Sequence, residues 1–285
     1  MISARVKRPL VSIIIPAFNE EKNITVCLDS IAHQDYKNTE VILVDDASLD
    51  QTVQFARKMG KKNNLNLRVI TQTVHKERGF TRNQGAELSK GDYLLFIDAD
   101  MKLEGKVISQ CMKAIEDSNL GAVIVPEESF GEGFWADCRR LEKRCYIGDN
   151  RIEAARFFIK KSFWNVGGWD KEMISGEDWD LTKRVGKKYV IGRIQAKILH
   201  NEGKLTLWNV IRKKFYYASN SGFYLRKYPL KVTDLLFFVI RPAYLRNWKL
   251  LFANPLTTIG MFFLKFIEIV AGGLGFLYSK LLSLH

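Results

Sequence analysis

Four short apolar runs alternate with segments of helical periodicity in the first 100 residues of the chain. Each run is short enough to form a strand that is buried on both faces of a sheet. The runs fall at 11–15, 41–44, 67–71 and 93–97. Strands and helices in alternation predict a parallel sheet with right-handed crossovers, in which the carboxyl ends of the strands meet at one edge.

Local chemistry sets the expected ends of these elements. Pro16 has no N–H to donate to a neighbouring strand, so we expect it to end the first strand. Residues 78–80 are expected to form a loop that precedes a helix through Ala86 and Leu88. Apolar positions from Ile24 to Ile31, spaced by three and four residues, predict the first helix.

Acidic side chains follow three of the predicted strands. They are Glu20 after the first strand, Asp45 and Asp46 after the second, and Asp98 and Asp100 after the fourth. Like charges at one sheet edge repel each other, and a divalent cation together with bound base or ribose groups would relieve this repulsion. A simpler alternative is that Asp98 and Asp100 only cap the next turn. Residues 16–20, Pro-Ala-Phe-Asn-Glu, lack the glycines of a dinucleotide or P-loop motif, so those two classes are disfavoured.

A second acidic motif lies in the glycine-rich segment 176–181. Glu177 and Asp178 are expected at the start of a helix, where the helix dipole favours an ionised carboxylate that could act as a general base. The alternative is that they are an N-terminal cap with flanking acids. His200 is expected at the end of an apolar strand run, 190–199, either as a metal ligand or as a structural residue.

Charge is distributed unevenly along the chain, whose formal net charge is +13. Residues 1–182 carry 26 Lys and Arg against 28 Asp and Glu, whereas residues 183–250 carry 16 against 2. Such a basic segment suits a polyanion, namely nucleic acid, an anionic membrane surface or a lipid diphosphate, although a solvated basic face is the alternative.

Apolar residues follow this basic segment and favour a membrane. One run spans 235–240, and Asn254-Pro255 is a plausible helix start for a 25-residue run to Ser279. That run would be about 37 Å long as a helix, enough to cross a bilayer core. Lys265 and Glu268 interrupt the run at helical spacing, and three glycines (Gly272, Gly273 and Gly275) either weaken it or permit close helix packing.

The helix is therefore expected to span or re-enter the membrane, to lie in its interface, or to oligomerise in a soluble protein. We divide the chain into a catalytic domain at 1–205, with halves at 9–101 and 102–205, basic interfacial helices at 206–252 and a hydrophobic helix at 253–285. The four cysteines show no metal spacing and no secretory signal is expected before them, so we interpret them as reduced packing residues on the cytoplasmic side.

The motifs together resemble the inverting family 2 glycosyltransferases. They occur in the expected order over roughly 9–205: Pro16 to Glu20, Val44 to Ser48, Arg82-Asn83, Asp98-Ala99-Asp100 and Gly176-Glu177-Asp178. The resemblance implies a GT-A fold, a Rossmann-like α/β architecture in which helices flank a mostly parallel sheet. It also implies a nucleoside-diphosphate sugar as donor and Mg²⁺ or Mn²⁺ as cofactor.

The resemblance also implies a role for individual residues. The residues implied to hold the nucleotide sugar are Pro16, Phe18, Glu20, Asp46, Arg82 and Asp98. Asp100 would bind the metal, with His200 as a late metal ligand, and Asp178 would be the catalytic base, supported by Glu177. Trp179, Arg212, Lys213 and Lys214 are assigned to the acceptor or the membrane surface.

The sequence thus predicts a metal-dependent transferase at the cytoplasmic face of the cell membrane that extends a lipid-linked saccharide. The acidic pair 177–178 favours a hydroxyl acceptor over the phosphate acceptor of a polyprenyl-phosphate glycosyltransferase, which is one alternative. A non-catalytic nucleotide-sugar-binding protein is another. A nucleic-acid-binding protein would explain the basic segment but not the apolar run. The donor sugar is not fixed by the sequence, with mannose from GDP-mannose the first choice, and oligomerisation through the last helix is possible.

Overall fold

The chain folds into two compact units in a computed structural model that describes residues 8–229 and 241–282. Unit 1 comprises residues up to 125, 155–169 and 181–198, and unit 2 comprises 126–154, 170–180 and 199 onward. The apolar run expected at 235–240 lies outside the described residues. The domain limits expected at 205 and 252 stay predictions.

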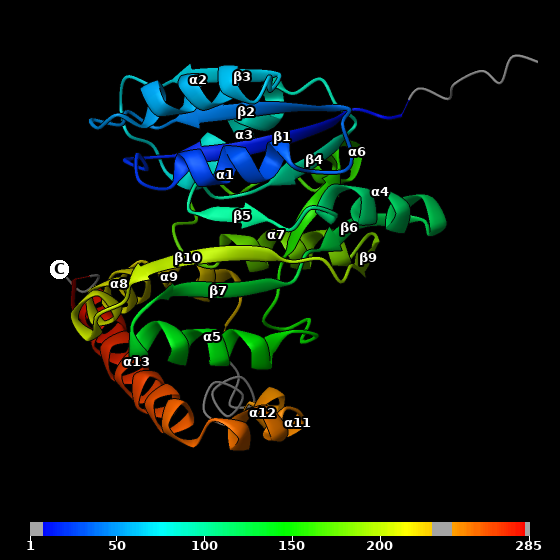
Figure 1. Cartoon of the computed structure of the whole chain (residues 1–285). Coiled ribbons are helices and arrows are strands. Elements are labelled where there is room, and N and C mark those ends of the chain that lie inside the picture. The colour runs from blue at the N-terminus through cyan, green and yellow to red at the C-terminus, as the bar shows by residue number, and fades with distance from the viewer. Residues whose placement is uncertain (1–7, 230–240, 283–285) are drawn as a thin grey trace, which may run out of the picture. The chain divides into compact units, whose positions relative to one another are not determined.

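Unit 1 is built on a seven-stranded sheet (Figure 1). Its strand order is β3-β2-β1-β4-β8-β6-β9. The strands are β1 Val11–Ala17, β2 Thr39–Asp45, β3 Leu67–Thr71, β4 Tyr93–Phe96, β6 Leu120–Ile124, β8 Ala155–Ile159 and β9 Val190–Arg193, and β5 Met101–Leu103 follows β4 outside this sheet. The first four strands are parallel, as predicted, whereas β8 runs antiparallel to both β4 and β6.

Helices cover both faces of this sheet. Their bounds are α1 Ile24–Ala32, α2 Thr52–Lys62, α3 Arg78–Leu88, α4 Val107–Asp117 and α6 Lys160–Asn165, together with α7 Glu177–Gly186, which begins in unit 2 and ends in unit 1. Alternate residues of β1 point to opposite faces: Ile13 and Ile15 pack in the core with α1, α2 and α4, whereas Ile14 packs in the core with α3, α6 and α7.

Three local expectations are corrected by the structure. Pro16 does not end β1, which continues to Ala17. The neighbouring strand β4 ends at Phe96, which pairs with Ile14, so β4 has no residue opposite Pro16 that would need its N–H. Residues 78–80 form the first turn of α3 rather than a loop. The apolar run 190–199 divides into two strands, so His200 lies inside a strand and not at its end.

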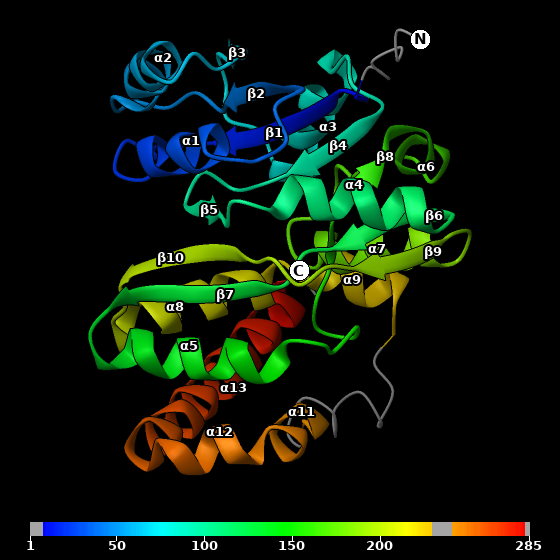
Figure 2. The same cartoon turned by 45° about the vertical axis from the view of Figure 1, so that its right-hand side comes forward.

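Unit 2 combines two strands with six helices in the described part of the chain (Figure 2). The elements are β7 Glu127–Glu132, α5 Phe134–Tyr146, β10 Ile198–Lys204, α8 Leu207–Ser219, α9 Gly222–Lys227, α11 Pro242–Arg246, α12 Trp248–Ala253 and α13 Pro255–Leu282. Strand β7 lies beside β10, and α13 packs against α5 and α8. An apolar core that includes Cys138, Leu141, Val210 and Leu264 joins these helices.

The last helix begins at Pro255, as the sequence predicted, because proline fits the first helical position. Within the described residues, α13 is the one helix whose length and mean hydropathy of 1.7 would suffice to cross a membrane. The four cysteines are buried thiols, as expected.

Candidate active site at the sheet edge and the late acidic helix

The loops that follow β1 and β2 are joined to each other by hydrogen bonds. The Asn19 backbone N–H donates to Ser48 Oγ (2.9 Å), and the Leu49 N–H donates to Asn19 Oδ1 (2.9 Å). Asn19 and Ala47 both have positive φ values, 55° and 63°, a conformation that costs energy in non-glycine residues. Non-glycine residues persist in this conformation where the surrounding contacts hold them, and such positions cluster at binding sites.

Phe18 and Asp46 extend from these two loops and share one neighbour, His75. The rings of Phe18 and His75 lie 4.5 Å apart, and Asp46 Oδ2 is 2.9 Å from His75 Nδ1. Asp46 also accepts the Lys76 N–H at 2.7 Å. Burial raises the Asp46 pKa and outweighs the opposing effect of the Lys76 hydrogen bond. Phe18 is 43% exposed, so an accessible aromatic face lies beside a buried carboxylate, an arrangement that suits a base and a ribose hydroxyl.

Glu20 stands at the same edge of the sheet. Its backbone N–H donates to Thr52 Oγ1 (2.7 Å), and its Oε2 accepts from Asn23 Nδ2 (2.8 Å). Burial raises the Glu20 pKa, and repulsion from Asp100 and Asp98 raises it further. The carboxylates of the first and fourth strand ends therefore lie near enough to interact, as predicted from the parallel topology.

Asp98 is held between two arginines. Arg82 Nη2 is 2.7 Å from Asp98 Oδ1, and Arg156 Nη1 is 3.6 Å from Asp98 Oδ2. Burial alone would raise the Asp98 pKa, but the attraction of Arg82, Arg156 and Arg78 outweighs it and holds that pKa well below its usual value. Asp98 is therefore ionised, and its charge is balanced by side chains of the chain itself.

Arg82 is fully buried and is fixed by α3 and the loop after α6. Its guanidinium lies over the Trp169 ring, 4.5 Å from the centroid. The neighbouring Asn83 exchanges two hydrogen bonds with the Trp169 backbone, at 2.8 and 2.9 Å. Gly168 has a φ of +65°, and a Cβ there would lie 2.7 Å from Asn83 Oδ1, so glycine is needed for this contact. These contacts hold Arg82 in one position beside Asp98.

The metal-ligand role of Asp100 stays a prediction. Among the residues that the structure describes, no group of three or more His, Cys, Asp and Glu side chains converges to hold a metal. Mg²⁺ and Mn²⁺ sites of nucleotide enzymes commonly use one or two carboxylates and complete the shell with substrate phosphates. Asp100 and the nearby Glu20 and Asp98 provide carboxylate oxygens of this kind, so the residues fit such an ion.

The late acidic motif begins α7, as predicted. Glu177, Asp178 and Asp180 all lie in the first turn, where the helix dipole stabilises negative charge. Asp180 is fully buried and is 2.8 Å from Lys227 Nζ, and it accepts the Tyr228 hydroxyl at 2.9 Å. Asp180 therefore fastens α9 to α7, whereas Glu177 and Asp178 are the acids of this turn that could serve chemistry.

Trp179 lies next to this pair and is 39% exposed. Its indole N–H donates to the Ile152 carbonyl (2.8 Å), and its ring lies 6.4 Å from the Tyr224 ring. Gly176, with a φ of +82°, packs so closely on Tyr224 that a Cβ would be 2.6 Å from that ring. The acidic turn therefore has an aromatic neighbour with an accessible face.

His200 lies within β10 in unit 2. Its Nδ1 is 3.1 Å from Glu127 Oε1, which is also 2.7 Å from Lys143 Nζ. This contact fixes the ring within unit 2, and the metal-ligand role of His200 stays a prediction.

The basic residues expected to meet the acceptor or the membrane lie on α8. Arg212 and Lys213 are exposed, and Lys214 is 46% exposed, although its Nζ is 3.9 Å from Glu268. The surface beside them forms a cavity of about 760 Å³ lined by aromatic and basic residues, among them Trp208, Arg212 and Tyr216.

Two residues of this site were not predicted from the sequence. Arg156 reaches Asp98 because β8 inserts beside β4 in antiparallel orientation, a pairing between distant segments that no local pattern reveals. His75 contacts Phe18 and Asp46 from the loop after β3. His75 could have been predicted, because it follows the third predicted strand and the carboxyl ends of parallel strands lie at the same edge of a sheet.

Comparison with known proteins identifies the family of the chain. The sequence model of the family described as Glycosyl transferase family 2 matches residues 12–164, more than half of the chain. The chain therefore belongs to this family, as the motifs predicted.

Relatives of the chain carry glycosyltransferase names. It is 34% identical over 117 residues to the poly(ribitol-phosphate) beta-N-acetylglucosaminyltransferase TarS of Staphylococcus aureus, a match that covers 40% of this chain and 20% of TarS. It is 32% identical over 186 residues to the PGL/p-HBAD biosynthesis glycosyltransferase of Mycobacterium bovis, covering 62% of this chain and 69% of that protein. The chain thus spans only a fifth of the length of TarS.

Solved structures with a similar fold are GT-A glycosyltransferases. The mannosyltransferase PcManGT of Pyrobaculum calidifontis, in complex with GDP-Man and Mn²⁺, has a TM-score of 0.56 and 18% identity, with 98% of this chain and 82% of that chain covered. TarS residues 1–349 in complex with UDP-GlcNAc has a TM-score of 0.53 and 20% identity, with 74% and 66% covered. The fold of this chain is the GT-A fold, as predicted.

Proposed function

We propose that the protein is a metal-dependent inverting glycosyltransferase that moves a sugar from a nucleoside-diphosphate sugar to a hydroxyl of a lipid-linked saccharide, at the cytoplasmic face of the cell membrane. The observation that carries the proposal is the carboxylate set at the sheet edge of a family 2 chain. Asp98 is neutralised by Arg82 and Arg156, whereas Glu20 keeps a raised pKa beside Asp98 and Asp100. A group of carboxylates at one sheet edge suits a cation-bound diphosphate.

The donor would be held by residues of unit 1. Phe18 would stack on the base, and Asp46 and Glu20 would accept hydrogen bonds from base and ribose groups. Asp98, held by Arg82, would position the ribose and diphosphate, while Asp100 would hold Mg²⁺ or Mn²⁺. When bound, the cation would neutralise the charge that develops on the departing nucleoside diphosphate.

The acceptor would be activated by the acidic turn at the start of α7. Asp178, supported by Glu177, would take the proton of the acceptor hydroxyl. The hydroxyl oxygen then forms a bond to the anomeric carbon as the bond from that carbon to the diphosphate oxygen breaks, and attack from the opposite side inverts the configuration. Trp179 offers an aromatic face beside the acid, and Arg212 with Lys213 would meet the diphosphate of the lipid-linked acceptor.

Two nucleotide sugars should be assayed first as donors. The structure of PcManGT is in complex with GDP-Man and that of TarS with UDP-GlcNAc, so both nucleotide sugars should be assayed with this protein. GDP-mannose is placed first because the PcManGT likeness covers 98% of the chain.

Asp178→Asn tests the catalytic assignment. We expect transfer to fall about 10²–10⁴-fold, the usual contribution of a general base, while donor affinity stays unchanged. Glu172→Gln, an exposed acid in the same unit, is the matched control and should retain activity. Near-normal turnover by Asp178→Asn would refute the role of Asp178.

The assignment of the acceptor surface needs its own variant. A double charge reversal, Arg212→Glu with Lys213→Glu, should lower transfer to lipid-diphosphate acceptors and leave donor hydrolysis unchanged. Unchanged transfer and unchanged membrane association in this variant would refute the role of α8.

A further inference from the structure

The polar side of α13 is fixed to α5 by a buried group of charges. Lys265 Nζ contacts Glu142 and is 2.5 Å from Glu268 on the same helix. Arg139 of α5 bonds both acids, with Nη2 2.5 Å from Glu268 and Nη1 2.5 Å from Glu142. These side chains are at most 13% exposed. The charged residues that interrupt the apolar run are therefore bound by the protein itself.

Glycines bring α13 close to its neighbours near both of its ends. A Cβ at Gly260 would lie 2.5 Å from the Phe134 ring of α5, and a Cβ at Gly275 would lie 2.5 Å from the Phe215 carbonyl oxygen of α8. These positions are 15 residues apart, about 22 Å along the helix. The helix therefore packs on unit 2 over most of its length.

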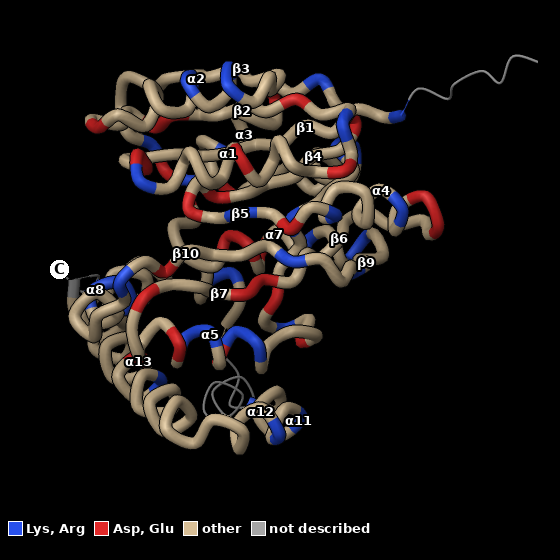
Figure 3. The backbone as a smooth tube through the Cα atoms, in the orientation of Figure 1, with Lys and Arg blue, Asp and Glu red and all other residues tan. Residues whose placement is uncertain are grey.

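The two supporting helices are unsuited to the interior of a bilayer. Charged side chains make up six of the thirteen residues of α5, and α8 adds Arg212, Lys213 and Lys214. Figure 3 shows charged positions of both signs along α5, whereas α13 beside it is almost uniformly uncharged. If α13 crossed a membrane while docked, it would draw these charges into lipid, and if it undocked, it would expose Lys265 and Glu268 there.

One side of α13 is apolar and exposed, and two of its residues, Phe263 and Tyr278, lie at its borders with α5 and α8. It carries Leu256, Ile259, Phe262, Phe263, Phe266, Ile269, Val270, Leu274, Leu277, Tyr278 and Leu281. This stripe runs almost the whole length of the helix, and a continuous apolar surface of that size marks an interaction site.

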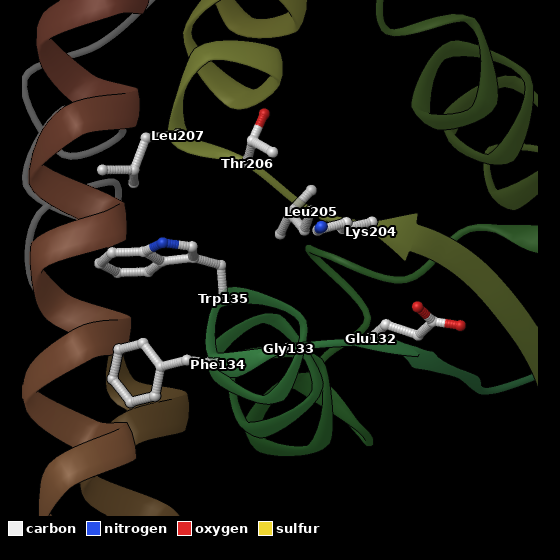
Figure 4. Close-up of a pocket in the computed structure, with 8 residues that line it drawn as sticks. All are labelled: Glu132, Gly133, Phe134, Trp135, Lys204, Leu205, Thr206 and Leu207. Atoms are coloured by element: carbon white, nitrogen blue, oxygen red, sulfur yellow. The ribbon is translucent and has the colours of Figure 1, made fainter.

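The apolar surface continues from α13 onto the start of α5. The Trp135 and Phe263 rings lie 5.9 Å apart. Trp135 also lines a cavity of about 560 Å³ with Phe134, Leu205 and Leu207. Figure 4 shows Phe134 and Trp135 pointing toward α13. Glu132 and Lys204 also line the cavity, so its apolar side, together with the stripe, forms the surface that would accept hydrocarbon chains.

Charge and aromatic residues beside this surface favour an anionic lipid leaflet as its occupant. Trp208 and Tyr216 of α8 are 65% and 52% exposed and flank Arg212 at helical spacing. Tryptophan and tyrosine are enriched at the membrane–water interface, and arginine binds anionic headgroups there. A second copy of the chain would bring another basic segment against this one, which like-charge repulsion opposes.

We propose that α13 lies in the plane of one leaflet of an anionic membrane, bound through this apolar stripe, and does not cross the bilayer. The proposal deepens the membrane association proposed above and rests on it. Unit 2 then carries its own membrane anchor as part of its folded core, and the acidic turn of α7 belongs to that same anchored unit.

Depth measurements on vesicle-bound protein test the orientation of α13. Single cysteines replace Ile259, Phe266 or Leu277, and Val26 in unit 1 as an exposed control. They are labelled with an environment-sensitive fluorophore; the four native thiols are buried, so labelling is specific. The protein is reconstituted with phosphatidylcholine and phosphatidylglycerol, and quenching is compared for lipids brominated near the headgroup and near the bilayer centre.

We expect the three α13 labels to be quenched equally and more strongly by the shallow bromines, and the Val26 label to remain unquenched. A crossing helix would instead place Phe266 deep with Ile259 and Leu277 shallow. That result would overturn the in-plane orientation but keep the membrane association. No quenching at any position, with dimeric protein in solution, would overturn both the orientation and the membrane association.

A charge on the stripe gives an independent check. Phe266→Asp should lower the vesicle-bound fraction at least tenfold, while Val26→Asp should leave it unchanged. Transfer to a short-chain, water-soluble acceptor is measured on the same variants. If Phe266→Asp loses vesicle binding but retains transfer, the membrane anchor and the catalytic site are separate functions. Normal vesicle binding by Phe266→Asp would contradict the role of the stripe.

Discussion

Each unit contains a group of acidic and basic side chains, and the two groups differ in how their acids are paired with cations. In unit 1, Asp98 is held by Arg82 and Arg156, and further acids, Glu20 and Asp100, stand near it. In unit 2, every acid of the group contacts cations: Arg139 and Lys265 each reach both Glu142 and Glu268.

The pKa values express this difference. Burial would raise the Glu268 pKa, but Lys214, Arg139 and Lys265 outweigh burial and lower it to about 2. In unit 1, burial and the acids nearby leave the Glu20 pKa above its ordinary value of 4.5. The ion pairs of unit 2 fasten α13 to α5, whereas the carboxylates of unit 1 form the proposed site for a cation and a diphosphate. The Glu20 and Glu268 pKa values therefore shift in opposite directions.

The largest effect is expected from breaking the ion pairs of unit 2. Glu268→Gln leaves the buried cations Arg139 and Lys265 with one acid, Glu142. The loss of one partner from a buried ion pair typically costs about 3–5 kcal/mol of unfolding free energy. Denaturant unfolding measures this loss, and donor affinity should not change. Glu172→Gln, exposed in the same unit, is the control. A stable Glu268→Gln protein would show that the group contributes little to docking α13.

Acidification should affect the two groups in opposite directions. Glu268 has a folded-state pKa of about 2 against 4.5 when unfolded, so its stabilising contribution is complete above pH 4.5 and disappears as the pH falls toward 2. Glu20 has a raised folded-state pKa, so its protonation removes an unfavourable contribution to the free energy of folding. Fluorescence of labels in unit 2 should therefore report loosening of α13 below pH 4.5. Glu268→Gln should weaken this pH dependence, and the remainder would come from Glu142, whose pKa is lowered by Lys265 and Arg139. Identical acid transitions in both proteins would contradict this assignment.

A smaller effect of opposite sign is expected at Glu20. Glu20→Gln removes a carboxylate that burial and two neighbouring acids destabilise, so the Tm of the ligand-free protein should rise slightly. Donor binding should weaken at the same time, because the site loses a hydrogen-bond acceptor. A lowered Tm would show that the Glu20 carboxylate stabilises the ligand-free protein, which would contradict this prediction.

Much of unit 1 could be predicted from the sequence because its information is local. The parallel strands β1 to β4 are apolar runs of strand length, and parallel topology alone placed Glu20 near Asp98 and Asp100. The start of α13 at Pro255 was equally local. Glycosyl transferase family 2 membership followed from the order of the motifs.

The remaining features depend on contacts between distant segments. Arg156 reaches Asp98 only through the antiparallel insertion of β8, and the inward charge group of α13 requires α5, whose Arg139 and Glu142 lie more than a hundred residues earlier. His200 was placed at a strand end because the apolar run 190–199 hides the break between β9 and β10. Hydropathy alone likewise cannot distinguish a crossing helix from one docked along a charged helix.

Thermal unfolding with nucleotide sugars tests most directly whether the sheet edge of unit 1 is a metal-dependent donor site. For the wild-type protein with Mn²⁺ and saturating GDP-mannose or UDP-GlcNAc, we predict a rise in Tm of roughly 5 °C that disappears when the metal is chelated. Asp100→Asn should lose the rise, whereas Asp92→Asn, an exposed acid before the same strand, should retain it. A rise that persists in Asp100→Asn or without metal, or no rise with any nucleotide sugar, would contradict the account.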